Sequence, residues 1–223
     1  MADLVTLPET PRLPVVDAHD APCGTFPVHR VLCVGRNYAD HAREMGGDPD
    51  REAPFFFLKP AGSVRQGSIV VYPARTADLH HEVELVLAVG PDGVLACGVG
   101  LDLTRRDRQA EMKAARRPWE AGKVFPGAAH CGVLRARAEV LEDPARRIHL
   151  DVNGVRRQDG RIGEMIHDAA TLLAEAEALF GLEAGDLLFT GTPAGVGPLI
   201  TGDHLRAEVE GLPVLTADVV EKN

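Results

Sequence analysis

Apolar residues along this chain fall mostly in short runs that are bounded by glycine, proline, asparagine or aspartate. Short runs rich in Val, Leu and Phe favour extended strands over helices. Turn signals at 91–93 (PDG) and 153–154 (NG) predict hairpins, so the two strands around the first turn should pair directly. The predicted strands span residues 28–35, 55–58, 69–72, 82–90, 94–104, 148–154, 187–190, 205–209 and 214–220.

Three segments carry helical signals instead. In the first, Asn37 is the predicted N-cap and Gly46-Gly47 the stop, which gives a helix of about two turns that must dock to be stable. The second spans residues 105–117, with Ala and Met on its predicted buried side. The third and longest spans 164–180 and ends at Gly181; its predicted inner side consists of Ile166, Ala170, Leu173 and Ala174.

These elements predict an α+β fold with a mixed sheet, because strands outnumber helices and do not alternate regularly with them. Residues 1–27 carry five prolines and little periodicity, so we expect an irregular or short-stranded N-terminal lead-in. Residues 28–223 are then one domain, which matches a length of 223 residues.

Composition narrows the class of protein. The net charge of −9 argues against general nucleic-acid binding, and no apolar run approaches the length that crosses a bilayer. The N-terminus shows no signal-peptide pattern, and the four cysteines are too widely spaced for a zinc knuckle or a disulfide framework. A cytoplasmic protein without nucleic-acid or membrane partners is therefore expected.

Two carboxylates, Glu82 and Glu84, stand at the start of the strongest strand signal. Residues i and i+2 of a strand point to the same face, so these side chains should project together, and Asp102 on the returning strand can join them. Three carboxylates with open positions describe a Mg²⁺ or Mn²⁺ site. Solvated surface glutamates are the alternative, and for an isolated E-x-E they are the commoner case.

Further residues carry possible chemistry near this site. His41 and Glu44 lie at i and i+3 of the short helix, where a carboxylate-held histidine can act as a general base, although a surface contact is the alternative. Lys59 ends a predicted strand. From 104 to 123 the chain carries seven basic and three acidic residues, which suits either a solvated helix face or a pocket for a small anion. In that segment Arg106 and Gln109 share a helix face.

Six motifs in order make the chain recognisable. It resembles the fumarylacetoacetate hydrolase family from Val31 to Val220, and within it the short, single-domain fumarylpyruvate hydrolases and the related acylpyruvases. The motifs are VGRNYADH (34–41), FLKP (57–60), HEVEL (81–85), LDLTRRD (101–107), GKVF (122–125) and TGTPAGVG (190–197).

This resemblance implies a β-rich fold with a rolled mixed sheet and a few flanking helices, one Mg²⁺ or Mn²⁺ ion per subunit, and a homodimer. It also implies residue roles. The metal-ligand places are taken by Glu82, Glu84 and Asp102. The places of a water-activating dyad, on a lid helix flanked by residues 46–53, are taken by His41 and Glu44. Lys123 takes the place of the active-site lysine, and the expected substrate contacts are Arg106, Gln109, Thr192 and Lys59.

The implied activity is hydrolysis of a carbon–carbon bond in a 2,4-dioxo acid, an acylpyruvate such as fumarylpyruvate, to pyruvate and fumarate in gentisate-type aromatic catabolism. Two alternatives remain open: an oxaloacetate decarboxylase or dienol-dicarboxylate isomerase that uses the same metal-chelated enolate, and a homologue without catalysis. The chain departs from the family pattern in a shorter 90–100 segment and in residues 126–132, which lack a proline-rich continuation.

Overall fold

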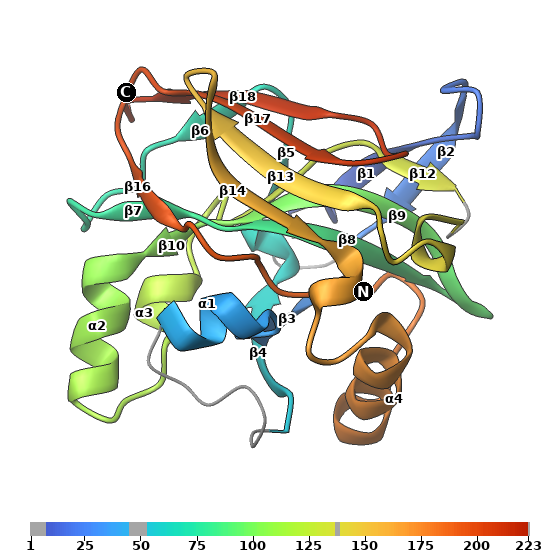
Figure 1. Cartoon of the computed structure of the whole chain (residues 1–223), viewed down its shortest axis with the longest axis horizontal. Coiled ribbons are helices and arrows are strands. Elements are labelled where there is room, and N and C mark those ends of the chain that lie inside the picture. Colours follow the sequence, from blue (N-terminus) through green and yellow to red (C-terminus); the bar gives the residue numbers. More distant parts are fainter. Residues whose placement is uncertain (1–7, 45–52, 137–138, 223) are drawn as a thin grey trace, which may run out of the picture.

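Strands make up most of the structure, a computed structural model that describes residues 8–44, 53–136 and 139–222, with residues 42–44 described by their backbone alone. Figure 1 shows the strands in crossing layers and the helices gathered along one side of them. The α+β prediction of a β-rich, rolled mixed sheet with few flanking helices is confirmed.

The largest sheet contains ten strands in the main order β2-β1-β12-β9-β8-β15-β3-β4, with β11 and β5 joined beside β9. It is mixed, because β1/β12, β15/β3 and β11/β5 are parallel pairs and the others are antiparallel. Its strands are β1 (Arg12–Val16), β2 (Pro22–Pro27), β3 (Arg30–Gly35), β4 (Phe55–Pro60), β5 (Val64–Gln66), β8 (Val83–Gly90), β9 (Gly93–Asp102), β11 (Ala129–Cys131), β12 (Leu134–Ala136) and β15 (Leu187–Phe189).

Two smaller sheets complete the β structure, in the orders β14-β13-β17-β18-β6 and β10-β7-β16. The predicted hairpin at 153–154 joins β13 to β14, with Asn153 at φ +53° and Gly154 at φ +75°. The strands are β6 (Ile69–Val71), β7 (Leu79–His81), β10 (Thr104–Arg105), β13 (Arg147–Val152), β14 (Val155–Arg161), β16 (Gly197–Leu199), β17 (His204–Val209) and β18 (Leu215–Val220).

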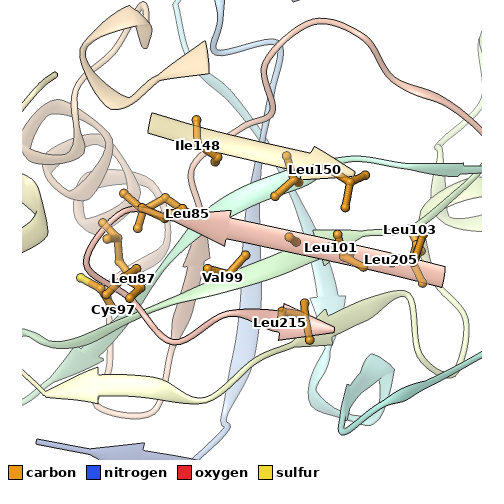
Figure 2. Packing of buried hydrophobic residues seen from close by; sticks show 14 of the residues in the cluster. Leu85, Leu87, Cys97, Val99, Leu101, Leu103, Ile148, Leu150, Leu205 and Leu215 are labelled. Atoms are coloured by element: carbon orange, nitrogen blue, oxygen red, sulfur yellow. The ribbon is translucent and has the colours of Figure 1, made fainter. Parts of the chain in front are cut away.

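The hydrophobic core lies on both faces of β8, which explains why its sequence is a continuous apolar run. On one face, Leu85 and Leu87 pack with Val99 of β9 and with Ile148 of β13, as Figure 2 shows. On the other face, Val86 and Ala88 belong to a second cluster with Phe189. Glu84 lies on this second face of β8 because side chains alternate along a strand, and its carboxylate is buried like the rest of the strand.

The shorter 90–100 segment still forms a regular hairpin. β8 and β9 pair from Gly90↔Gly93 to Val83↔Leu101, with a bulge at Ala88/Val89. Residues 129–131 of the other unusual stretch form β11, between β5 and β9. In the N-terminal region, β1 and β2 are two short strands that belong to the large sheet. Of the irregular and the short-stranded alternatives for this segment, the structure has the short-stranded one.

Four α-helices and three short 3₁₀ helices occur in the described part of the chain, none long and apolar enough to cross a membrane. In Figure 1, α1, α2 and α3 lie together on one side, with α4 beside them. The helices are α1 (Ala39–Glu44), α2 (Arg106–Ala114), α3 (Glu120–Lys123), α4 (Ala169–Phe180), η1 (Ala61–Ser63), η2 (Glu139–Glu142) and η3 (Ile162–Glu164).

Two predicted helix starts are wrong. α1 begins at Ala39, and the Asn37 side chain bonds elsewhere: it donates to the carbonyls of His167 and Thr190 and accepts from the His167 N–H. α4 begins after Asp168, whose carboxylate accepts from the Thr171 N–H as a true N-cap.

The predicted buried faces also need correction. In α4 the buried residues are Ala169, Leu172 and Ala176. Of the predicted inner residues, Leu173 packs half-buried against the core, Ala170 and Ala174 are exposed, and Ile166 precedes the helix. In α2 the alanines are exposed and Gln109 is the buried residue, because this helix turns its polar side inward. Gly181 caps α4 as predicted, at φ +57°.

Candidate active site

Three buried carboxylates meet where β8 begins and β9 ends. Glu82 occupies the break between β7 and β8, Glu84 is the second residue of β8, and Asp102 is the last residue of β9. The Asp102 N–H donates to the Glu82 carbonyl over 2.9 Å, which holds the two backbones side by side. One oxygen from each carboxylate lies within 4.8 Å of the others. The convergence follows from strand alternation and the tight turn.

Basic side chains neutralise part of this charge. The Lys123 ammonium donates to Oε2 of Glu82 over 2.8 Å and to Oδ2 of Asp102 over 2.6 Å. Arg106 donates to Oε1 of Glu82 over 2.5 Å. Burial alone raises the pKa of Glu82, but Lys123 and Arg106 outweigh it and hold the pKa below its usual range.

Glu84 has a different environment. Its Oε2 accepts from the Gly191 N–H over 2.7 Å. Burial, followed by the charges of Asp102 and Glu82, raises the pKa of Glu84 well above its ordinary value. The triad therefore carries unfavourable repulsion that a bound cation relieves, and its donors are all oxygen, which suits Mg²⁺ or Mn²⁺. Glu82, Glu84 and Asp102 fit as ligands of a divalent cation.

Lys59 does not line the pocket in this structure, although it was expected to touch substrate. Its side chain is completely buried, and its ammonium donates to the carbonyls of Lys123 and Ala128 over 2.6 and 2.9 Å. The same ammonium lies 2.7 Å from Oδ1 of Asp102, an ion pair without hydrogen-bond geometry. Lys59 thus stands behind Asp102 and ties it to the α3 region.

A pocket opens over the triad, and most of the predicted site residues line it. His41 of α1 is 5% exposed and helps to lower the pKa of Glu82. Arg106 donates to Oε1 of Gln109 over 2.7 Å. Glu44 ends α1, and its side chain lies outside the described residues, as do residues 45–52 of the predicted lid. The lining residues are Val34, Gly35, Arg36, His41, Phe55, Phe57, Glu82, Glu84, Arg106, Gln109, Lys113, Trp119, Lys123 and Thr192.

The pocket is basic beyond its carboxylate floor. Arg36, Arg106, Lys113 and Lys123 all line it, so the basic segment at 104–123 does turn several charges inward. Burial, then Arg106 and Arg36, lowers the pKa of Lys113. Sequence reasoning did not single out Lys113; its place seven residues after Arg106, on the same helix face, was the available signal.

Aromatic rings form another wall of the pocket. Phe55 and Phe57 of β4 lie on one strand face, and the Phe55 ring meets Trp119 edge-on at 5.4 Å. The Lys123 ammonium lies 5.0 Å from the centre of the Phe57 ring. Apolar walls around a charged floor exclude water and strengthen the electrostatic interactions inside.

Thr192 lines the pocket from the glycine-rich loop after β15. Its hydroxyl donates to the Val83 carbonyl over 2.8 Å and accepts from the side-chain amide of Gln158 over 2.7 Å. Gln158 and its partner His81 were not among the predicted site residues. No local signal marks them, because Gln158 reaches the site from β14 in another sheet.

Comparisons with known proteins agree with this geometry. Residues 30–220 match the family model described as fumarylacetoacetate (FAA) hydrolase C-terminal. The oxaloacetate tautomerase YcgM of Escherichia coli is 39% identical over 206 residues, covering 86% of this chain and 93% of the relative. The human mitochondrial oxaloacetate tautomerase FAHD1 is 36% identical over 201 residues, covering 85% and 90%.

Solved structures give the same picture. The crystal structure of fumarylpyruvate hydrolase from Pseudomonas aeruginosa in complex with Mn²⁺ and pyruvate superposes with a TM-score of 0.91 at 39% identity. The superposition covers 99% of this chain and all of that one. The similarity therefore extends over the strands that carry the three carboxylates and over the loops and helices that surround them.

Proposed function

Because the chain belongs to the fumarylacetoacetate hydrolase family, we propose that it hydrolyses a carbon–carbon bond of a 2,4-dioxo acid, with fumarylpyruvate as the substrate that yields pyruvate and fumarate. The observation that carries the proposal is one pocket that is lined by Glu82 and Glu84 of the carboxylate triad and by His41, Arg106 and Lys123. The neighbouring structure that holds Mn²⁺ and pyruvate supports the same substrate class.

The proposed metal ligands are Glu82, Glu84 and Asp102, with Mg²⁺ or Mn²⁺ as the cation. When bound there, such a cation supplies Lewis-acid polarisation of an α-oxo acid. The protein's own cations complement it. Arg106 and Lys123 stand beside the floor of the pocket, where they attract a carboxylate and stabilise negative charge that develops on the substrate.

His41 is the proposed general base, with Glu44 as its orienting partner. A neutral imidazole in the pocket wall takes a proton from water, and the oxygen adds to the C4 carbonyl. The C3–C4 bond then breaks, its electron pair passes to C3 as the enolate of pyruvate, and a proton returns to that carbon. Lys123 carries the positive charge that favours the enolate.

A second carboxylate on the substrate is suggested by the outer part of the pocket. Arg36 and Lys113 line it in addition to Arg106 and Lys123, whose charges face the carboxylates Glu82 and Asp102. A fumaryl group supplies such a second carboxylate. We therefore favour fumarylpyruvate over acylpyruvates with uncharged acyl groups, and Arg36→Met should raise KM for fumarylpyruvate more than for acetylpyruvate.

Keto–enol tautomerisation of oxaloacetate is a second candidate, because both sequence relatives described above are named oxaloacetate tautomerases. It needs proton transfer at C3 without attack of water. One experiment separates the candidates: purified protein with Mn²⁺ is mixed with fumarylpyruvate and, separately, with enol-oxaloacetate. Release of pyruvate from the first supports hydrolysis. Fast ketonisation of the second with no pyruvate from either supports tautomerisation.

We also propose that the protein is cytoplasmic, as its composition indicates, and a homodimer, as the family resemblance implies. All four cysteines are free, and Cys33, Cys97 and Cys131 are buried, which is compatible with a reducing compartment. Sedimentation equilibrium of the full chain tests the dimer: a mass of about twice 23.9 kDa is expected. A monomer at micromolar concentration contradicts it.

A further inference from the structure

Gln158 is an unusual residue for its position. It lies on β14 among exposed neighbours, pairs with Leu150 of β13 and has no exposed surface. A buried side-chain amide is costly unless its polar atoms are bonded. Here the amide oxygen is bonded to the Val83 N–H at 3.0 Å and to Nδ1 of His81 at 2.9 Å. Its nitrogen donates to the Pro193 carbonyl at 2.9 Å and to the Thr192 hydroxyl at 2.7 Å.

The partners determine which way the amide faces. The Val83 N–H can only donate and the Pro193 carbonyl can only accept, so the amide oxygen must face Val83 and the NH₂ must face Pro193. His81 therefore donates from Nδ1. Thr192 likewise has no choice: its oxygen accepts from Gln158, and its own proton goes to the Val83 carbonyl at 2.8 Å.

Both segments held by Gln158 belong to the site. Val83 stands between Glu82 and Glu84, and the loop of Thr192 includes Gly191, whose N–H donates to Glu84. Thr192 itself lines the pocket. A hydroxyl whose proton is already donated offers the pocket only a lone pair. It accepts from a ligand hydroxyl, and it repels a carboxylate or ketone oxygen, which has no proton to give.

We propose that Gln158 is a positioning residue that holds the Thr192 hydroxyl as a hydrogen-bond acceptor toward the pocket, so that the site prefers a ligand hydroxyl there, as in an enol, a hydrated ketone or a 2-hydroxy acid. The inference rests on the proposed function only in taking small α-oxygenated acids as ligands. It holds for hydrolysis and for tautomerisation alike, because each reaction passes through a form of the ligand that carries a hydroxyl, a hydrated ketone in the first and an enol in the second.

Two small ligands test the direction of the hydrogen bond at Thr192. Glycolate carries a hydroxyl beside its carboxylate, and oxalate replaces it with a second carboxylate. We expect Thr192→Val, measured by calorimetry on the Mn²⁺-loaded full chain, to weaken glycolate binding about fivefold to tenfold and to leave oxalate within about twofold. Thr192→Ser restores the glycolate affinity, because it keeps the hydroxyl.

Gln158→Met tests the positioning role. It retains the length of the side chain and removes the amide that holds both the Thr192 oxygen and the Val83 backbone, so the hydroxyl loses its fixed orientation toward the pocket. The ratio of glycolate to oxalate affinity should fall as in Thr192→Val. Leu150→Ala is the matched control, because Leu150 is the residue of β13 that pairs with Gln158 and does not line the pocket. Its ratio of glycolate to oxalate affinity should equal that of the wild type.

The outcomes separate this inference from the proposed function. Wild-type protein that binds Mn²⁺ and both ligands, with a ratio that Thr192→Val does not change, contradicts the inference alone. Loss of oxalate affinity as large as that of glycolate also contradicts it, because Thr192 would then be donating. Should Gln158→Met fail to fold, the Thr192→Val and Thr192→Ser pair still tests the acceptor role of the hydroxyl, on which the role of Gln158 depends. Wild-type protein that binds neither Mn²⁺ nor oxalate contradicts the proposed function as well.

Discussion

The charged residues of the site are arranged in two layers. In the upper layer, Arg106 and Lys123 reach the carboxylates from the pocket side. In the lower layer, Lys59 reaches Asp102 from the interior, with no exposure to solvent. A lysine is rarely buried so completely unless its charge is paired, and here a carboxylate and two carbonyls compensate it. Lys59 therefore supports the position of Asp102.

Lys59→Met should be strongly destabilising, because Oδ1 of Asp102 and the Lys123 carbonyl lose the buried ammonium that faces them, and Lys123 pairs only with Oδ2. Breaking a buried pair from one side costs about 3–5 kcal/mol. Urea unfolding of the metal-free protein measures the free energy of unfolding. Lys222→Met, at an exposed position, is the control and should change it by less than about 0.5 kcal/mol. An equally small change for Lys59→Met would show that Lys59 does not support Asp102.

His41→Ala should lower kcat by about 10²- to 10⁴-fold, the range that a general base contributes. Mn²⁺ affinity should be unchanged, because His41 is not one of the three carboxylate ligands. Glu44→Gln is expected to act in the same direction. Kinetics with fumarylpyruvate and calorimetry with Mn²⁺ measure the two properties separately, and a loss of Mn²⁺ affinity in His41→Ala would contradict the division of roles.

At the scale of elements, each helix is defined by its ends and by what it packs against. α4 begins at the Asp168 cap and ends at Gly181, and Arg30 donates to the carbonyls of Phe180 and Gly181 at that end. Arg30 also pairs with the buried carboxylate of Asp186. These contacts join α4 to β3 and β15, the strands that precede the helix of His41 and the loop of Thr192.

Asp168→Ala should lower the free energy of unfolding by about 1 kcal/mol near neutral pH, the usual cost of losing an N-cap. The bonds from the backbone of Thr171 lower the pKa of Asp168 in the folded state. The contribution is therefore complete above the unfolded pKa of about 3.9 and is lost as pH falls through the lower folded value. Asp168→Asn keeps the cap, so its stability should match the wild type at neutral pH. Urea unfolding between pH 2.5 and 7 checks both variants.

At the scale of the whole molecule, the site lies where three sheets and three helices meet. The large sheet supplies Glu84 and Asp102, the five-stranded sheet supplies Gln158, and the three-stranded sheet supplies its partner His81. The helices α1, α2 and α3 supply His41, Arg106 and Lys123. Binding of a cation at the triad links these parts through their shared carboxylates. Ligand that binds only the folded state then stabilises the entire domain.

Mn²⁺ should accordingly raise the melting temperature of the wild type, with a gain of about 2.7 kcal/mol at a free concentration of 100 times Kd. EDTA should reverse the effect. Glu84→Gln should lose most of it, because an amide oxygen is a weaker ligand and leaves the triad with one charge fewer. Differential scanning calorimetry with and without Mn²⁺ provides the measurement. Equal gains in wild type and Glu84→Gln would place the cation elsewhere.

Much of the site was predictable from sequence because its rules are local. Glu82 and Glu84 point the same way through strand alternation, and a two-residue turn sets the pairing that takes Asp102 to them. Arg106 and Gln109 face one pocket through the helical repeat. The strand pattern likewise predicted the hairpins and the β-rich fold, since each of these features is determined by residues close together along the chain.

Other features depended on tertiary contacts that no local rule contains. The alanine-rich pattern of α4 was compatible with more than one buried face, and the packing of Ala169, Leu172 and Ala176 against the core decided between them. Lys59 is exposed or buried according to what the chain places 64 residues later, at Lys123. Gln158 reaches Val83 across 75 residues and two sheets. The sequence by itself determined that Glu82, Glu84 and Asp102 come together, because alternation and turns act over a few residues. Only the tertiary structure decided which side chains support them, because those contacts exist only after the sheets have packed.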